Sequence, residues 1–276
     1  MPLILVRKFF AALEAAARTV HAGLSCTSAK GSVSVKLQEY KVWDATTRIF
    51  HWLNVLCVLG LIAVGTVILN GDALGASAGG KITLKTVHVW IGYVFVLNLL
   101  WRLVWGFIGG PYARWRSILP FGRGYAAQLG GEVAALREGR VQNYLGHTPV
   151  GRIAVTVLFG ALLLQGATGL ILAGTDLYMP PFGNAIAAKV AAVGVDPDQV
   201  RPNAPETVDP EAYKAMRATR ASVVETHEIM YFVLLGLIAL HIFAVVITEI
   251  KHGGNIISAM VSGRKSFAAP PADRPE

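Results

Sequence analysis

Residues 226–250 of the chain read THEIMYFVLLGLIALHIFAVVITEI. This stretch decides the fold, because about 20 mainly apolar residues are enough to cross a lipid bilayer as a helix. Three further stretches share its character, so we predict membrane-spanning helices at about 49–69, 86–108, 153–174 and 226–250. Helices are expected because lipid offers backbone N–H and C=O groups no hydrogen-bond partner. The predicted fold class is an all-α membrane protein, a bundle of four transmembrane helices.

The composition of the 276 residues supports a membrane protein. Hydrophobic residues make up 54% of the chain and charged residues 15%, whereas soluble domains carry about 25% charged residues. The formal net charge of +8 is typical of basic cytoplasmic loops in a membrane protein, so membrane lipid, and not nucleic acid, is the expected partner. Two cysteines and no Cys-x-x-Cys-His motif exclude covalent haem attachment and a four-cysteine iron–sulfur cluster.

The chain divides into three predicted regions. Residues 1–40 contain no span and do not resemble a signal peptide, so we expect a poorly ordered or surface-lying cytoplasmic tail. Residues 41–252 form the four-helix domain, and residues 253–276 form a cytoplasmic C-terminal tail. The link at about 175–225 is unusually long, and its proline-rich middle predicts a partly ordered lid and not a fifth span.

The loop charges predict the orientation in the membrane. Arginine is abundant between the second and third spans, and Lys and Arg also flank the first and last spans, at 36–48 and 251–265. Cytoplasmic loops carry such an excess, so both termini should be cytoplasmic. The link between the third and fourth spans is acidic on balance and should face the opposite side. In a bacterium this arrangement is a multi-pass protein of the inner membrane with that link in the periplasm.

Four histidines lie within or at the edges of the spans, where ionisable residues usually mark function. His227 and His241 are 14 residues apart, close to four helical turns, so they share one face at levels roughly 21 Å apart. His88 begins the second span at the outer level, and His51 begins the first span at the inner level. We predict an outer pair, His88 and His227, and an inner pair, His51 and His241. Two such pairs from facing helices suit two six-coordinate haems b.

The same spacing gives secondary candidates. Arg102 stands 14 residues beyond His88, and Arg48 stands one turn before His51, so both are predicted to bind propionates of the inner haem. Gly65, 14 residues beyond His51, would let the outer macrocycle approach the backbone. The competing interpretations are that the arginines are snorkelling anchors and that a single histidine only bonds a neighbouring helix.

Other functional classes are weighed against electron transfer. His227 and Glu228 begin a zinc-protease helix motif, but Tyr231 occupies the position of its second histidine. A histidine-containing transporter would favour acidic residues in mid-span, and the mid-span regions have none. An autonomous reductase or oxidase of a small diffusible oxidant, and an anchor that only holds a partner, stay open.

The histidine-bearing motifs resemble those of the bacterial cytochrome b561 and nickel-hydrogenase b-type subunit family over about residues 40–266. The matching stretches are VWDATTRIFHW at 42–52, HVWIGY at 88–93, WRLVWG at 101–106, GHTPVG at 146–151, THE at 226–228, LH at 240–241 and IISAMVSGRK at 256–265. One departure is Thr148, where the family often has Asn, which weakens any quinone assignment near His147.

This resemblance implies two haems b, with outer ligands His88 and His227 and inner ligands His51 and His241. It also implies electron transfer between a periplasmic redox partner and membrane quinone near the inner haem. The partner could be a hydrogenase, another oxidoreductase or a cytochrome c, so the chain is expected to be an electron-transfer subunit and not a stand-alone enzyme. The sequence leaves open the partner's identity, the direction of electron flow and the oligomeric state.

Overall fold

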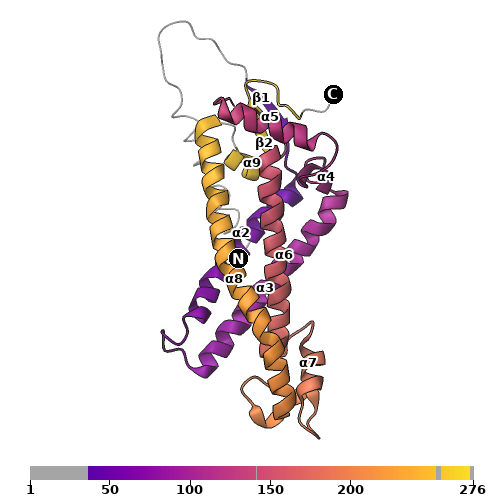
Figure 1. The fold of residues 1–276 in the computed structure, drawn as a ribbon, viewed down its shortest axis with the longest axis vertical. Helices are drawn as coiled ribbons and strands as arrows, with labels where there is room; N and C mark the ends of the chain where they lie inside the picture. Colours follow the sequence, from indigo (N-terminus) through magenta and orange to yellow (C-terminus); the bar gives the residue numbers. More distant parts are fainter. Residues whose placement is uncertain (1–36, 141, 253–255, 274–276) are drawn as a thin grey trace, which may run out of the picture. The chain divides into compact units, whose positions relative to one another are not determined.

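A computed structural model describes residues 37–140, 142–252 and 256–273. The elements, shown in Figure 1, are β1 (Gln38–Lys41), α2 (Ala45–Leu69), α3 (Ala78–Ile108), α4 (Trp115–Ile118), α5 (Tyr125–Arg137), α6 (Pro149–Leu177), α7 (Gly183–Val190), η1 (Pro197–Gln199), η2 (Pro205–Thr207), α8 (Pro210–His252), α9 (Ile256–Ser262) and β2 (Arg264–Phe267). The sequence-based prediction for residues 1–36 falls outside the described residues.

Four of the described helices, α2, α3, α6 and α8, are long and apolar enough to cross a membrane. The fold-class prediction is therefore confirmed. Each helix begins before the predicted span, because hydropathy detects only the segment that faces lipid. Helix α6 starts at Pro149, where the Thr148 hydroxyl accepts a 3.0 Å hydrogen bond from the Gly151 backbone N–H, the cap expected of threonine at this position.

The chain forms two compact units, and each long helix contributes residues to both. Of the described residues, unit 1 contains those from 37 to 51, from 105 to 156 and from 240 onward, and unit 2 contains those from 52 to 104 and from 157 to 239. The outer histidine pair, His88 and His227, belongs to unit 2. The inner pair, His51 and His241, belongs to unit 1. Each histidine pair therefore lies within a single unit.

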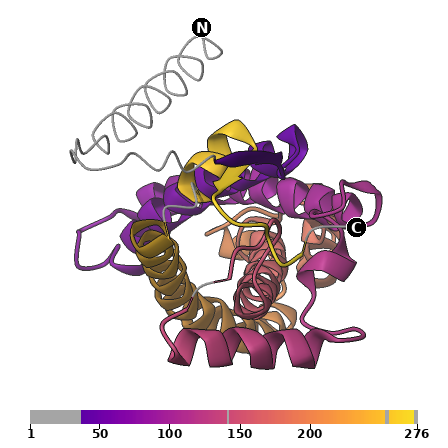
Figure 2. The ribbon, with the colours of Figure 1, turned by 90° about the horizontal axis from the view of Figure 1, so that it is seen from above.

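The core of unit 1 joins the two ends of the described chain. Strands β1 and β2 pair antiparallel, with Gln38 opposite Phe267 (Figure 2). Val42, Trp43, Leu145, Ala259 and Phe267 form the buried cluster beside them. The backbone N–H groups of Val42 and Trp43 both donate to the Gly263 carbonyl, at 2.8 and 3.1 Å. Residues 256–273, which belong to the predicted cytoplasmic C-terminal tail, are therefore folded into this unit, and the side of the membrane on which they lie stays a prediction.

Two side chains fix the start of α2 in unit 1. The Asp44 carboxylate accepts a 2.7 Å hydrogen bond from the Thr47 backbone N–H, which caps the helix, and a 3.2 Å bond from the Trp105 indole N–H on α3. Gly106 is also required on α3, because a Cβ there would lie 2.1 Å from the Trp115 indole nitrogen. The contacts of Asp44 fix the start of α2, and His51 lies on the second turn of this helix.

The long link of unit 2 is ordered by its own small core. Helix α7 and the turns η1 and η2 bury Ala187, Val190, Val200 and Val208. Tyr213 and Met216, on the first two turns of α8, pack against this cluster, and the Asp209 carboxylate caps α8 through a 2.8 Å bond from the Ala212 N–H. The fourth helix thus begins at Pro210, well before the predicted start of the span at about 226.

Candidate functional site

Unit 2 contains a cavity of about 420 Å³ between α2, α3, α6 and α8. This volume is in the usual range for sites that hold small molecules and cofactors. Its walls are mostly apolar, and the exceptions include the two outer histidines, Gln165, Tyr231 and a set of charged residues. A large apolar cavity with a few convergent polar groups is the expected form of a cofactor site.

His88 and His227 both line this cavity, and their ring centroids lie 6.4 Å apart at an interplanar angle of 74°. An imidazole nitrogen binds a metal at about 2.0–2.1 Å and lies about 1.1 Å from its ring centroid, so two imidazoles on opposite sides of one ion have centroids roughly 6.2–6.4 Å apart. The observed spacing fits an ion between the two rings. The residues present therefore fit a bis-histidine haem.

The hydrogen bonds of His227 define which nitrogen carries its proton. The buried Thr168 hydroxyl lies 3.0 Å from the Leu164 and Gln165 carbonyl oxygens and 2.8 Å from His227 Nδ1. Since the hydroxyl has one proton and two carbonyl acceptors for it, it accepts from His227 Nδ1–H. The lone pair of His227 then resides on Nε2, where the Gln165 amide nitrogen donates at 3.0 Å.

Glycines lie beside both outer histidines. A Cβ on Gly65 of α2 would be 3.3 Å from His88 Cε1, and a Cβ on Gly169 of α6 would be 3.4 Å from His227 Cε1. Both glycines line the cavity. Side chains at these positions would fill the space beside the rings. Gly65 thus lies beside His88, and the approach of a macrocycle to its backbone stays a prediction.

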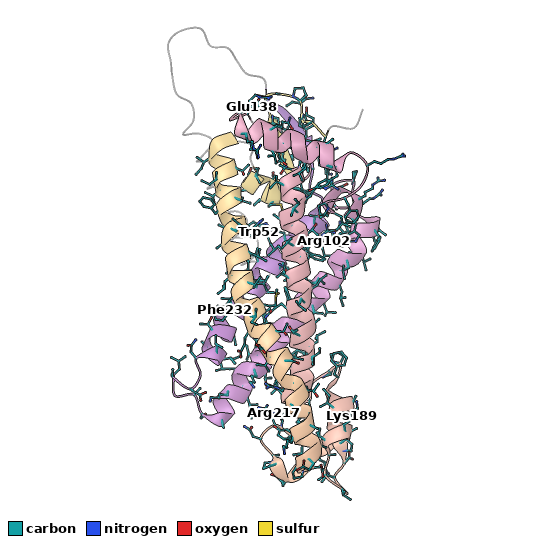
Figure 3. The ribbon with its side chains drawn as sticks, in the orientation of Figure 1. Trp52, Arg102, Glu138, Lys189, Arg217 and Phe232 are labelled. Atoms are coloured by element: carbon teal, nitrogen blue, oxygen red, sulfur yellow. The ribbon has the colours of Figure 1, made fainter. Side chains whose placement is uncertain are left out.

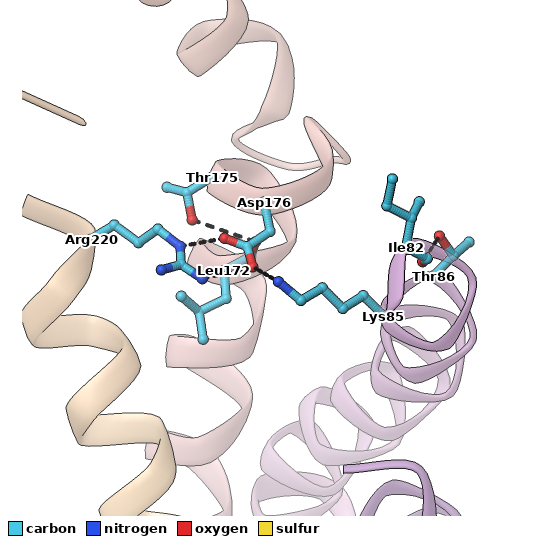
Figure 4. A network of polar contacts seen from close by, with 7 residues as sticks. All are labelled: Ile82, Lys85, Thr86, Leu172, Thr175, Asp176 and Arg220. Atoms are coloured by element: carbon cyan, nitrogen blue, oxygen red, sulfur yellow. Dashed lines mark hydrogen bonds and ion pairs between the residues drawn. The ribbon is translucent and has the colours of Figure 1, made fainter. Parts of the chain in front are cut away.

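The polar end of the cavity is a partly buried ion cluster, drawn in Figure 4. The Asp176 carboxylate on α6 accepts a 2.5 Å bond from the Lys85 ammonium on α3. It also accepts two bonds from the Arg220 guanidinium on α8, through Nε and, at 2.7 Å, through Nη2. The side chains of Asp176 and Arg220 are 9% and 13% exposed. All three residues line the cavity.

Tyr231, which stands where a zinc-protease motif would have its second histidine, makes a different contact. Its hydroxyl lies 2.9 Å from the Thr66 hydroxyl on α2. Thr66 itself donates at 2.6 Å to the Ile62 carbonyl, so Tyr231 donates to Thr66. The tyrosine thereby links α8 to α2 at the wall of the outer cavity.

The inner pair lies in unit 1. His51 on α2 and His241 on α8 are close enough to interact electrostatically. Arg48, one turn before His51, donates through Nη1 to the Val261 carbonyl, while its buried Nε has no hydrogen-bond partner among the described residues. Arg102 is buried on α3 in unit 2 (Figure 3), so its proposed contact with the inner haem stays a prediction.

Sequence comparison agrees with this geometry. Residues 42–263 match the family model described as prokaryotic cytochrome b561. The chain belongs to the prokaryotic cytochrome b561 family. This membership confirms the resemblance of the histidine motifs, and it makes the chain a b-type cytochrome of the membrane that binds haem b and transfers electrons.

Curated relatives of the family share nearly the full length of this chain. A protein named probable Ni/Fe-hydrogenase B-type cytochrome subunit from Rhizobium leguminosarum bv. viciae is 24% identical over 90% of this chain and 98% of its own length. A protein of the same name from Azotobacter vinelandii is 25% identical over 85% and 90%. The Escherichia coli K12 protein named probable Ni/Fe-hydrogenase 1 B-type cytochrome subunit is 25% identical over 82% and 90%.

Sequence reasoning missed the residues that surround the outer histidines. Gln165 and Thr168 carried a usable signal, because polar side chains within an apolar span usually face the protein interior. Lys85 and Arg220 stand three and seven residues before His88 and His227, so helical periodicity places each on the face of its histidine. The position of Asp176 between them has no local sequence signal.

Proposed function

We propose that this cytochrome carries two haems b and passes electrons between a periplasmic redox partner and quinone in the bacterial inner membrane. The observation that carries the proposal is the 6.4 Å separation of the His88 and His227 rings across a cavity of cofactor size. His51 and His241 both lie in unit 1 and interact electrostatically, which supports a second, inner site. A catalytic residue is not assigned, because bound haem supplies the one-electron chemistry.

The protein's part in the outer site is to position and prepare His227. Thr168 accepts the Nδ1–H, which fixes the ring and leaves the Nε2 lone pair available for iron. A hydrogen-bonded Nδ1–H also makes the ligand more basic. The Gln165 amide now occupies that lone pair, so it must turn away when a metal binds. His88 supplies the second nitrogen from the facing helix α3.

The inner site is proposed to use His51 and His241, with Arg48 and Arg102 as candidate partners of the propionates. Arg48 is supported by its position one turn before His51 and by its buried Nε, for which the described part of the chain offers no hydrogen-bond partner. Burial of an arginine nitrogen without an acceptor is costly, and a carboxylate would remove that cost. Arg102 is supported by its helical register with His88 and by its burial.

The partner and the orientation are also proposals. The relatives are named as subunits of Ni/Fe-hydrogenases, so a hydrogenase is the first partner to test, ahead of other oxidoreductases or a cytochrome c. The loop charges support cytoplasmic termini. With that orientation the outer haem faces the periplasmic partner, and quinone reacts near the inner haem.

Two variants test this order of electron transfer. The protein is reconstituted in vesicles with a short-chain quinone in the lipid and an impermeant reductant on the outer side. Wild-type protein should reduce the quinone. His88→Ala should block electron input from outside, whereas His51→Ala should leave a reducible outer haem that cannot pass electrons to quinone. Rapid quinone reduction by His51→Ala would refute the proposed path.

A further inference from the structure

We propose that Lys85 and Arg220 form the binding site for the propionate carboxylates of the outer haem, and that Asp176 holds these two cations in position. This inference rests on the proposed function, because it requires a haem between His88 and His227. It concerns a part of the cavity that the histidine pattern does not address.

The helical register places both cations on the outer side of the ligands. Lys85 precedes His88 by three residues, about 4.5 Å along the helix axis, and Arg220 precedes His227 by seven residues, about 10.5 Å. Three and seven residues are close to one and two whole turns. Each cation therefore shares a helix face with one ligand, and all four residues line one cavity.

The cluster has one positive charge more than its own carboxylate neutralises. Asp176 supplies one negative charge against two cations. The Arg220 and Asp176 side chains are largely buried, and the Lys85 side chain is 36% exposed. Lys81 also lines the cavity, but it is paired with Asp72, and Glu228 at the cavity is exposed on α8. Because an unbalanced buried charge is costly, this end of the cavity favours an additional carboxylate.

The cluster also retains hydrogen-bond donors for such a carboxylate. Asp176 accepts one of the three N–H groups of Lys85 and two of the five of Arg220. The close-up in Figure 4 shows Asp176 between the two side chains, each reaching it from a different helix. This bridge orders two long, flexible side chains before the ligand binds, which lowers the entropy cost of binding.

The test combines protein variants with an altered haem. Protein made without haem is titrated with haem b or with its dimethyl ester, which lacks both propionate charges. The variants are Lys85→Met and Arg220→Gln, and the matched control is Lys81→Met, another cation at the cavity on the same helix. The readouts are the haem dissociation constant and the midpoint potential of the outer haem.

We expect each cluster variant to bind haem b at least tenfold more weakly at the outer site and to lower the potential of the outer haem. Wild-type protein should bind the dimethyl ester more weakly than haem b by a similar factor. The cluster variants should bind the dimethyl ester as well as the wild type does. Lys81→Met should bind haem b and its dimethyl ester with the same affinities as the wild type. Arg220→Lys, which keeps the charge but not the planar fork, should lie between wild type and Arg220→Gln.

Three results would overturn the inference. Equal weakening of haem b and ester binding by the cluster variants would mean that Asp176, Lys85 and Arg220 only hold the helices together. Wild-type binding of haem b by both variants would mean that the cations do not meet the propionates. If Arg220→Gln does not accumulate, Arg220→Lys takes its place in the test. Wild-type affinity of Arg220→Lys for haem b and for the dimethyl ester would equally exclude a propionate contact. Wild-type protein without an outer haem would instead refute the proposed function.

Discussion

Replacement of Thr168 by valine tests how the protein prepares His227 as a ligand. Valine keeps the shape of threonine but removes the hydroxyl that accepts from His227 Nδ1–H at 2.8 Å. A buried donor left without an acceptor costs about 1–3 kcal/mol. Loss of such a partner of a ligating histidine typically weakens metal binding by about 10–100-fold, so we expect the outer haem to bind more weakly by a factor in this range.

The same substitution should raise the midpoint potential of the outer haem. The hydrogen bond makes the imidazole more basic, which favours oxidised iron, so its loss favours the reduced state. If the oxidised form loses tenfold more affinity than the reduced form, the potential rises by about 59 mV. A redox titration that resolves both haems measures this shift. Thr168→Ser, which keeps the hydroxyl, is the control.

Two results would refute this reasoning. An outer haem with the wild-type potential and affinity in Thr168→Val would mean that the hydroxyl does not orient His227. A shift of the inner haem equal to that of the outer haem would point to a general defect of folding. Since Thr168 contacts His227 of the outer pair directly, at 2.8 Å, the account requires an effect confined to the outer haem.

Two further predictions concern charged residues. Arg102→Gln should lower the midpoint potential of the inner haem and leave that of the outer haem almost unchanged, because a nearby cation favours the added electron. Arg102→Lys, which keeps the charge, should restore part of the lost potential. A redox titration that resolves both haems measures these shifts. Burial lowers the pKa of Lys265 to about 8, and Asp273 opposes that shift only in part. The unfolded chain then holds one proton more than the folded chain between about pH 8 and the usual lysine pKa near 10.4, so folding stability should rise with pH in that window, by up to about 3 kcal/mol in total. Thermal unfolding in detergent should show this rise in the wild type and not in Lys265→Met, and the same rise in the variant would contradict the assignment.

The proximity of His88 and His227 could be predicted from sequence because helix geometry is local, and their role as haem ligands stays a prediction. The 14-residue step from His227 to His241 assigns the two residues to different levels, and the position of His88 near the start of its span gives the partner. The early start of α8 could not be predicted from hydropathy. Its first turns are polar and are held by Tyr213 and Met216 against Val190 and Val200, which is tertiary packing.

The ion cluster and the C-terminal segment were missed for a similar reason. Lys85 and Asp176 are 91 residues apart, and Arg220 and Asp176 are 44 apart, so neither contact has a sequence period that would reveal it. Residues 264–267 look like the start of a basic tail, but they pair with β1 near the other end of the described chain. Such pairings depend on how the whole chain folds.

The central claim, two haems held by two specific histidine pairs, is tested most directly by counting haem in single-histidine variants. Purified wild-type protein should contain two acid–acetone-extractable haems b per chain. His88→Ala and His227→Ala should each retain one haem, with the same spectrum and potential, and His51→Ala and His241→Ala should each retain the other. One haem in the wild type, or a match between His51→Ala and His227→Ala, would contradict the account.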